Sequence, residues 1–288
     1  MSYDGIHQRG TKYDYVINEP CDHANGPYLL VLVISDPRNF KARWMIRETT
    51  GTVKSYDGKR IRTVFIVGRT ENASIERNIT LESARHRDII KIAFDDSYKN
   101  YTLKALLAFR WTIEHCANVS YVLRCGHDIT AHYKEIVQYV SELPSNLASN
   151  LFAGKLIRKG TPVFRDPHGK WYQSREEFSQ DTYPAYILGF ASLFSFDVIR
   201  RIHYASLWKH LFMEDIFTSS LATENNITLT HNPNFWQYGS DKLLERECCL
   251  LSSLAIHRAP NFRVWSALNG NRSKTEACGR QGCFVTPK

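Results

Sequence analysis

Residues 28–35 are Tyr-Leu-Leu-Val-Leu-Val-Ile-Ser, an apolar run that ends at the breaking pair Asp36-Pro37. A strand that is covered on both faces has this composition, because neither face of such a strand meets water. Strands of this kind belong to sheets with helices on both faces, which is the arrangement of α/β proteins. The run therefore predicts a buried strand in an α/β domain of this 288-residue chain.

Strand and helix patterns alternate after this run. Apolar strand patterns recur at 62–67, 89–94 and 120–124, and helical spacing occurs at 39–49, 75–86 and 102–116. The alternation predicts a parallel, helix-covered sheet of Rossmann type. Ligands of such sheets bind beyond the carboxyl ends of the strands, so we expect functional residues directly after them.

The alternation weakens after about residue 135. The patterns that follow are a helix at 133–143, a strand at 151–159, a helix capped by Ser195 that runs through residue 203, and a helix from Glu214 to about residue 223. No linker rich in Pro, Gly or Ser separates the two parts. We therefore predict a single domain over residues 28–288, with halves at 28–135 and 136–288, after an N-terminal extension of residues 1–27.

The composition limits the classes of function. Lysine and arginine exceed the acids by 37 − 29 = +8, an excess that attracts anionic partners such as phosphorylated small molecules. The basic residues are spread along the chain without a run of five or six like charges, so we expect no nucleic-acid binding. The 43% of apolar residues can form a large core, which excludes a disordered chain.

Cysteines and glycosylation motifs point to the secretory pathway. The seven cysteines contain no Cys-x-x-Cys pair, and the spacings of Cys248-Cys249 and of Cys278 and Cys283 favour disulfides over zinc. Asn-x-Ser/Thr motifs for N-glycosylation occur at Asn72, Asn78, Asn100, Asn118, Asn226 and Asn271. We expect a secretory chain, although some of these motifs can arise by chance.

The sequence contains neither a signal peptide nor an apolar run long enough to span a bilayer. Two explanations stay open. Either a membrane anchor lies upstream of this sequence, or the chain is not secreted.

Gly126-His127-Asp128 directly follows the strand pattern at 120–124. Mn²⁺ binds both carboxylate oxygen and imidazole nitrogen, so His127 and Asp128 could hold a cation that bridges two phosphates. The alternative is a glycine-containing turn with a surface histidine and an aspartate that caps a helix.

Glu214 and Asp215 stand at the start of a predicted helix, where acids interact favourably with the helix dipole. The alternative is that apolar neighbours raise the pKa of one carboxylate, which then acts as a general base. Lys104, in the first turn of the helix at 102–116, could reach a phosphate, and a solvated lysine is the alternative.

These features belong to blocks whose order resembles the β-1,3-galactosyltransferase and β-1,3-N-acetylglucosaminyltransferase group, glycosyltransferase family 31. Residues 38–49 (RNFKARWMIRET) are similar to the pattern R-x-x-x-R-x-x-I-R-x-T-W-G, with Thr50 in place of the tryptophan and Gly51 retained. Residues 94–104 (FDDSYKNYTLK) resemble F-x-D-x-Y-x-N-L-T-x-K. The other similar blocks are Trp111, Cys116, Lys170-Trp171-Tyr172, Tyr183-Pro184-Ala185-Tyr186 and Glu214-Asp215-Ile216.

The resemblance implies a GT-A fold, in which a Rossmann-like nucleotide-binding half with a mixed sheet is joined to an acceptor-binding half. It also implies a type II Golgi membrane protein, with its lumenal catalytic domain in this chain and its anchor outside this sequence. It implies an inverting transfer of galactose or N-acetylglucosamine from a UDP-sugar, in β-1,3 linkage, to a glycan acceptor on protein or lipid. Mn²⁺ is the implied cofactor. Residues 28–135 become the nucleotide-sugar half, and residues 136–288 become the acceptor half.

The resemblance also implies roles for individual residues. The catalytic base would be Asp215, with Glu214 beside it, and the metal ligands would be Asp128 and His127. The residues expected near the donor are Arg43, Arg47, Lys104 and Asp96. Those expected near the acceptor are Trp171, Tyr183, Tyr186 and Gly189.

The chain departs from the family pattern in three places. The family's lysine, variable residue and three aspartates are replaced by Arg124-Cys125-Gly126-His127-Asp128, which keeps only the last aspartate. Phe190 and Ala191 stand in a turn that is rich in glycine in the family. Ser219 replaces the glycine that the family usually has after the E-D-V block. Two hypotheses follow. One is an active transferase in which His127 replaces a lost ligand, and the other is a non-catalytic relative that binds a glycan or a partner glycosyltransferase.

Overall fold

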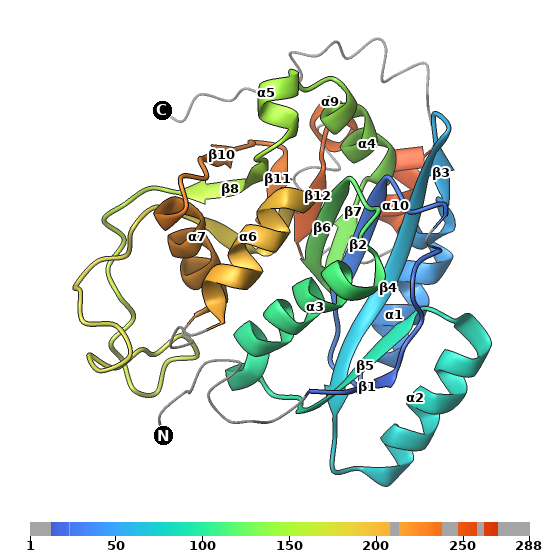
Figure 1. Ribbon diagram of the computed structural model, residues 1–288, viewed down its shortest axis with the longest axis horizontal. Coiled ribbons are helices and arrows are strands. Elements are labelled where there is room, and N and C mark those ends of the chain that lie inside the picture. The colour runs from blue at the N-terminus through green and yellow to red at the C-terminus, as the bar shows by residue number, and fades with distance from the viewer. Residues whose placement is uncertain (1–12, 23, 208–212, 238–246, 258–261, 270–288) are drawn as a thin grey trace.

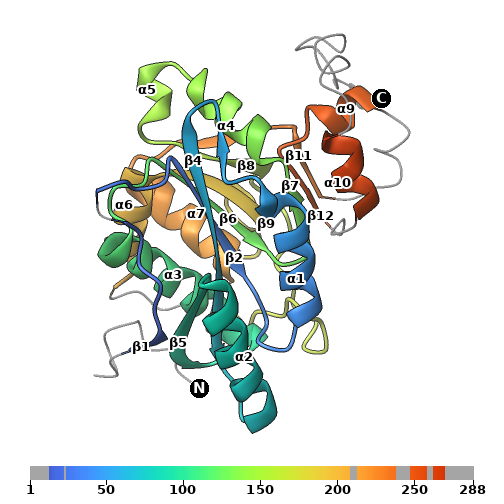
Figure 2. The ribbon, with the colours of Figure 1, turned by 90° about the vertical axis from the view of Figure 1, so that its right-hand side faces the viewer.

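The computed structural model describes residues 13–22, 24–207, 213–237, 247–257 and 262–269 of the chain. These residues form a central mixed sheet with helices on both faces, as Figures 1 and 2 show from two directions. The strand order is β1-β5-β4-β2-β6-β9-β8-β10, and the short strand β3 (Ser55–Tyr56) pairs with β4. The expected α/β class with a mixed sheet is confirmed.

The predicted parallel strands lie together at the centre of the sheet. Their bounds are Ile89–Asp95 for β5, Lys59–Arg69 for β4, Leu29–Ile34 for β2 and Tyr121–Gly126 for β6. All three neighbouring pairs among them are parallel. In β2, Ile34 is level with Gly126 of β6, so the two strands end together and the segments that follow them lie side by side.

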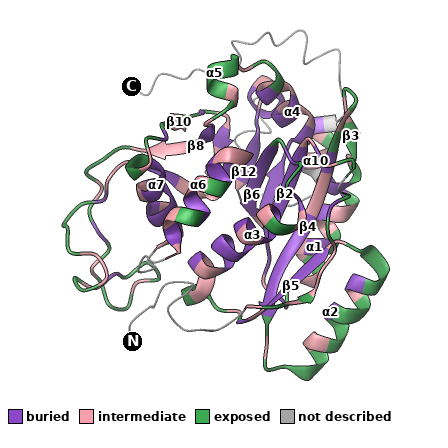
Figure 3. Ribbon diagram, viewed as in Figure 1, coloured by how far each residue is buried: buried purple, intermediate pink, exposed green. Residues whose placement is uncertain are grey.

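The side chains of β2 alternate between two core layers, which explains its unbroken apolar composition. Leu30, Leu32 and Ile34 belong to the first layer. The helices on that face are α3 (Tyr101–His115), α6 (Phe196–Ser206) and α7 (Glu214–Glu224). The helices that contribute to the second layer are α1 (Phe40–Glu48), α2 (Ala73–His86) and α4 (Tyr133–Ser141). Figure 3 shows the central strands buried between these layers, while much of α2 and α5 (Ser145–Ala148) is exposed.

The second half of the chain extends the sheet in an antiparallel direction. β9 (Tyr186–Ser195) pairs antiparallel with both β6 and β8 (Phe152–Ile157), and β10 (Leu229–His231) is parallel to β8. The sequence did not identify β9 and instead indicated a turn at Gly189, Phe190 and Ala191. That expectation is wrong, because all three residues lie within the strand and Ala191 pairs with Cys125 of β6.

A small separate sheet joins distant parts of the chain. Its order is β11 (Phe235–Trp236), β12 (Ala255–His257) and β7 (Ile129–Ala131). Two further helices lie near the carboxyl end of the described residues, α9 (Glu247–Leu251) and α10 (Phe262–Asn269). Because β7 begins directly after Asp128, this small sheet brings residues near position 257 to the end of β6.

The helix α6 begins where the sequence predicted, but its first residue acts differently. Ser195 is the N-cap residue, yet its hydroxyl makes no capping hydrogen bond to the helix. Its Oγ instead accepts a hydrogen bond of 2.9 Å from the backbone N–H of Leu151. The predicted N-cap position of Ser195 is therefore confirmed, but its side chain does not cap the helix, because the chain before β8 offers its oxygen another donor.

The described part of the expected N-terminal extension is joined to the sheet. β1 (Tyr15–Ile17) pairs antiparallel with β5, and Cys21 forms a disulfide with Cys116 at the end of α3. Cys248 and Cys249 are also disulfide-bonded, whereas the buried Cys125 is free. Cys278, Cys283 and Asn271 lie outside the described residues. No described helix is long and apolar enough to cross a membrane.

We predict that the Cys21–Cys116 disulfide makes a large contribution to stability, because it joins residues that are 95 positions apart. A cross-link over such a distance removes much of the conformational freedom of the unfolded chain. The double substitution Cys21→Ala/Cys116→Ala should therefore lower the free energy of unfolding by about 2–4 kcal/mol in urea titrations. Cys125→Ala is the control, since it removes a buried thiol without removing a cross-link. An equal effect of the two variants would contradict the prediction.

Candidate active site

Three acidic residues, Asp128, Glu214 and Asp215, lie at the carboxyl edge of the central strands. Asp128 follows β6, and Glu214 and Asp215 begin α7 beside Gly189 of β9. Burial raises the pKa of Tyr101, which lies at the start of α3, and the charges of Glu214 and Asp128 both add to this rise. The structure therefore brings the predicted metal ligand and the predicted base to one edge of the sheet.

Asp128 is paired with a histidine that the sequence did not identify. Its Oδ2 lies 3.1 Å from Nε2 of His257, the last residue of β12. The other ring nitrogen of His257 lies 3.1 Å from the carbonyl oxygen of Gln237. Burial opposes the ionisation of Asp128, but the hydrogen bond from His257 and the charges of His257 and His127 hold its pKa below the usual range. An ionised carboxylate is the form that binds a cation.

Gly126 leaves room for the Asp128 carboxylate. A Cβ atom at position 126 would lie 2.7 Å from Oδ1 of Asp128, closer than two such atoms can approach. A side chain at this position would therefore require the Asp128 carboxylate, the flexible end of its side chain, to shift. The glycine leaves the observed contact between Asp128 and His257 undisturbed.

His127 faces a different partner from Asp128. Its Nε2 lies 2.7 Å from the side-chain amide of Asn39, at the start of α1, and its Nδ1 lies 3.4 Å from the carbonyl oxygen of Ile34. The imidazole therefore connects the loop after β6 to the loop after β2. Within the described residues, no group of three or more His, Cys, Asp or Glu side chains could hold a metal ion.

Glu214 forms a buried ion pair with Arg124, which lies in the middle of β6. The guanidinium NH2 is 2.9 Å from Oε1 of Glu214, and both side chains are almost completely buried. Burial raises the pKa of Glu214 to about 7; the Arg124 charge opposes this rise and Asp215 adds to it. Arg124 also donates to the carbonyl oxygen of Gly189 and, at 3.1 Å, to the hydroxyl of Ser192. One cation thus fixes α7 and β9 to β6.

Asp215 differs from Glu214 because it is only partly buried. Its Oδ2 accepts a hydrogen bond of 3.2 Å from the N–H of Gly189. A Cβ at Gly189 would lie 3.2–3.3 Å from atoms of Asp215 and from Oε2 of Glu214, so the glycine permits this close approach. Burial raises the pKa of Asp215, while backbone hydrogen bonds from Gly189 and Ile216 lower it. The result is a positioned carboxylate that still reaches the surface.

The two arginines expected near the donor are bound to acids of the protein. Arg43 is fully buried and pairs with Glu82 of α2 at 2.6 Å, and it also donates to the carbonyl oxygen of Asp36 at 2.9 Å. Arg47 pairs with the same Glu82 at 2.6 Å and with Asp88 at 2.8 Å. Both guanidinium groups therefore hold α1 to α2, and Arg43 also holds the loop after β2.

Lys104 and Asp96 form another internal pair. The lysine Nζ lies 2.5 Å from Oδ2 of Asp96 and 2.5 Å from the carbonyl oxygen of Ser35. Burial lowers the pKa of Lys104, and Asp96 opposes that change. Asp96 also accepts a hydrogen bond of 2.7 Å from the N–H of Gly68. The pair joins the carboxyl ends of β2, β4 and β5 to α3.

The aromatic residues expected near the acceptor separate into two groups. Tyr183 and Tyr186 are buried, and the Tyr183 hydroxyl donates to Gln173 at 2.7 Å. Trp171 is 47% exposed, and the preceding residue, Lys170, lies over the ring of Tyr98, with its Nζ 4.7 Å from the ring centroid. The Asp215 and Glu214 carboxylates both add to the effect of burial that raises the pKa of Tyr98. Tyr98 therefore lies within electrostatic range of the predicted base.

The departures from the family pattern have specific contacts. The ring of Phe190 stacks on His257, with ring centroids 5.5 Å apart and planes inclined by 18°. The hydroxyl of Ser219 accepts a hydrogen bond of 3.0 Å from the backbone N–H of Ile187 in β9. Phe190 thus covers the partner of Asp128, and Ser219 satisfies a buried donor near the base.

The five described glycosylation motifs have different settings. Asn72 caps α2 by accepting hydrogen bonds from Ser74 and Ile75, and Asn78 lies within the same helix. Asn100 donates to the carbonyl oxygen of Asp95 at 2.8 Å. The remaining two, Asn118 and Asn226, are exposed residues in turns.

Sequence reasoning missed His257 and the structural role of Arg124. Nothing in the neighbourhood of His257 forms a motif, since its partner is 129 positions away in the chain. A signal did exist for Arg124, because a charged residue inside an apolar strand pattern requires a buried partner. The sequence alone did not identify that partner.

Comparison with known proteins gives consistent matches. The family model described as Galactosyltransferase matches residues 41–233. Human β-1,3-galactosyltransferase 1 is 29% identical over 266 residues, which cover 90% of this chain and 80% of that protein. Human lactosylceramide 1,3-N-acetyl-β-D-glucosaminyltransferase is 30% identical, with coverage of 86% and 67%. Chimpanzee β-1,3-galactosyltransferase 5 is 32% identical, with coverage of 74% and 72%.

Among solved structures, the catalytic domain of Drosophila β1,4-galactosyltransferase 7 in complex with xylobiose matches with a TM-score of 0.39 and 10% identity. The match covers 72% of this chain and 66% of that chain.

The raised pKa of Glu214 predicts a pH dependence of stability. The pKa of this carboxyl is about 7 in the folded protein and 4.5 in the unfolded chain, so between these values the folded protein holds a proton that the unfolded chain loses. The stability that this proton contributes is therefore complete below pH 4.5 and is lost as the pH rises to 7. Glu214→Gln, which stays neutral, should lack this loss. In urea titrations, the free energy of unfolding of the variant relative to that of the natural protein should increase between pH 5 and pH 7.5, by on the order of 3 kcal/mol. The exposed Glu176→Gln is the control, and parallel pH curves for Glu214→Gln and the natural protein would refute the assignment.

Proposed function

Because the chain belongs to the galactosyltransferase family, we propose that it is an inverting β-1,3-hexosyltransferase. It would move galactose or N-acetylglucosamine from a UDP-sugar to a glycan acceptor on protein or lipid. The observation that carries this proposal is the partly buried Asp215, held by Gly189 at 3.2 Å and placed at the same sheet edge as Asp128. The proposed activity agrees with the names of the matched relatives, which are β-1,3-galactosyltransferases and a 1,3-N-acetylglucosaminyltransferase.

Asp215 has the properties of a general base. Its raised pKa increases its affinity for a proton compared with an ordinary aspartate, while the Gly189 N–H keeps the carboxylate oriented. In the proposed reaction, Asp215 removes the proton of the acceptor hydroxyl as that oxygen attacks the anomeric carbon of the donor sugar. The bond from that carbon to the UDP oxygen breaks on the opposite face, which inverts the configuration. Glu214 does not contact the acceptor in this scheme; with Arg124, it holds the helix that carries Asp215.

The Asp128–His257 pair fits a divalent cation such as Mn²⁺. A carboxylate oxygen and an imidazole nitrogen are both ligands of that ion. Asp128 and His257 would hold the cation through one carboxylate oxygen and one imidazole nitrogen, in place of the hydrogen bond of 3.1 Å that joins them here. When bound, such a cation neutralises the charge of the departing diphosphate. With two protein ligands, its affinity would depend strongly on the diphosphate of the donor, and His127 would support the site through Asn39.

We propose that the catalytic domain lies in the Golgi lumen. The Cys21–Cys116 disulfide and the exposed glycosylation motifs at Asn118 and Asn226 support an oxidising secretory compartment. The alternative of a non-catalytic relative is not favoured, because the predicted base and Asp128 both have ordered, charge-stabilising partners.

We predict that Asp215→Asn lowers the rate of sugar transfer by at least about 10²-fold, because the amide cannot accept the hydroxyl proton. UDP binding, measured by thermal shift, should remain close to that of the natural protein. Transfer should be assayed with UDP-galactose and with UDP-N-acetylglucosamine, and the exposed Asp166→Asn is the matched control. In the natural protein, kcat should rise as the pH increases through the raised pKa of Asp215. Undiminished turnover by Asp215→Asn would exclude this residue as the base.

We predict that Gly126→Ala weakens UDP binding in the presence of Mn²⁺, although it adds only a methyl group. The new Cβ would displace the Asp128 carboxylate, from which it would lie only 2.7 Å. His257→Gln should weaken the same Mn²⁺-dependent binding, while Ser55→Ala on the distant strand β3 should have no effect. The measurement is the UDP-induced thermal shift with Mn²⁺ and with chelator. Equal shifts for Gly126→Ala and the natural protein would show that the observed carboxylate position is not needed for cation binding.

A further inference from the structure

A cavity lies at the opposite end of the central strands from the candidate active site. It has a volume of about 490 Å³ and is bordered by Tyr28 before β2, Tyr121 at the start of β6 and Ser195 at the end of β9. Five steps along β6 at about 3.3 Å each separate Tyr121 from Gly126, a distance of roughly 17 Å. The cavity is therefore a separate site and no part of the proposed transfer reaction.

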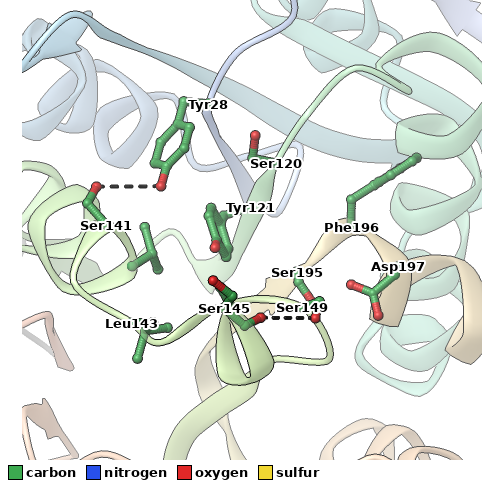
Figure 4. Close-up of a pocket in the computed structure, with 12 residues that line it drawn as sticks. Tyr28, Ser120, Tyr121, Ser141, Leu143, Ser145, Ser149, Ser195, Phe196 and Asp197 are labelled. Atoms are coloured by element: carbon green, nitrogen blue, oxygen red, sulfur yellow. Dashed lines mark hydrogen bonds between the residues drawn. The ribbon is translucent and has the colours of Figure 1, made fainter.

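The walls of this cavity present hydroxyl groups and aromatic rings. Figure 4 shows Tyr28 and Tyr121 on one side and Phe196 with Asp197 on another, around an open centre. The exposed serines at its border are Ser120, Ser141, Ser145 and Ser149. Hydroxyls can donate to and accept from the hydroxyls of a sugar, the Asp197 carboxylate accepts from them, and aromatic faces cover the apolar face of a pyranose ring. The volume suits one or two sugar residues.

A glycosylation motif stands at the border of the same cavity. Ser120 is the hydroxyl residue of the motif Asn118-Val119-Ser120, and it is also a wall residue. The Cα atoms of Asn118 and Ser120 are at most about 7 Å apart, which is within the reach of a sugar attached to Asn118. Asn118 also packs against Gly26, where an added Cβ would lie 2.6 Å from the Cβ of Asn118. Gly26 is two residues before the wall residue Tyr28, which precedes β2, and Asn118 is two residues before Ser120, which precedes β6. The motif is therefore held beside the cavity by the segments that enter both β2 and β6.

We propose that Asn118 carries an N-linked glycan whose first sugar residues occupy this cavity. In the modification, a bond forms between Nδ2 of Asn118 and the anomeric carbon of N-acetylglucosamine. The bond from that carbon to the diphosphate of a lipid-linked oligosaccharide breaks, the lipid diphosphate leaves, and the amide loses one proton to a base. The proposal rests on the lumenal setting given under the proposed function, but it does not require transfer activity.

The test uses the full chain secreted from mammalian cells behind a cleaved signal peptide. Glycopeptide mass spectrometry should find Asn118 occupied. Under native conditions, peptide N-glycosidase should release the Asn118 glycan roughly tenfold more slowly than the glycan at the exposed turn residue Asn226, because release follows the fraction of undocked glycan. After denaturation the two sites should react equally. An unmodified Asn118 in a chain that is modified at Asn226 would overturn the proposal.

A cavity-filling variant separates docking from attachment. Ser145→Trp introduces an indole at an exposed wall position without changing the motif, so occupancy at Asn118 should persist while its protection from the glycosidase is lost. Ser149→Tyr is a second variant for the same measurement if the first is not secreted. Equal native release rates at Asn118 and Asn226 in the natural protein would overturn docking, as expected if the cavity instead binds a separate glycan. Transfer from UDP-sugars is assayed on the same preparations, so a protected Asn118 glycan without transfer would refute only the proposed function.

Discussion

The ion pair between Arg124 and Glu214 is the interaction on which the candidate active site depends. A buried guanidinium and a buried carboxylate are costly to remove from water, and Arg124 lowers that cost for Glu214 without returning its pKa to the ordinary value. From the middle of β6, Arg124 also donates to the carbonyl of Gly189. The N–H of the same glycine then fixes Asp215. A chain of short contacts thus connects the central strand β6 to the carboxylate that we propose as the base.

The residues that depart from the family pattern form a consistent local arrangement. Gly126 gives the Asp128 carboxylate its space, His257 supplies the facing imidazole, and Phe190 covers that imidazole. A side chain at position 126 would require the Asp128 carboxylate to shift. The metal block thus contributes one partner of the carboxylate–imidazole pair, Asp128, and the other partner, His257, lies outside the block.

The two ends of the central strands have different chemistry. At the carboxyl edge, acids pair with basic side chains: Glu214 with Arg124, Asp96 with Lys104 and Asp128 with His257. At the amino edge, a cavity of about 490 Å³ is lined mainly by uncharged hydroxyls and aromatic rings. Charged pairs suit a phosphorylated donor, and neutral hydroxyls suit sugars. The same parallel strands therefore support two sites that do not share a residue, because each site uses the loops of only one edge.

The sequence by itself determined the central parallel strands, the helices between them and the places where Asp128 and Asp215 would stand. These features depend on local sequence patterns. The unbroken apolar run of β2 is typical of a buried strand, and the spacing of apolar residues in α3 is typical of a helix. Only the tertiary structure decided the partners: His257 for Asp128, Arg124 for Glu214, and Glu82 for Arg43. It also decided that β9 runs antiparallel beside β6. Pairings between residues 39 to 129 positions apart follow from how the layers pack, and no local pattern encodes them.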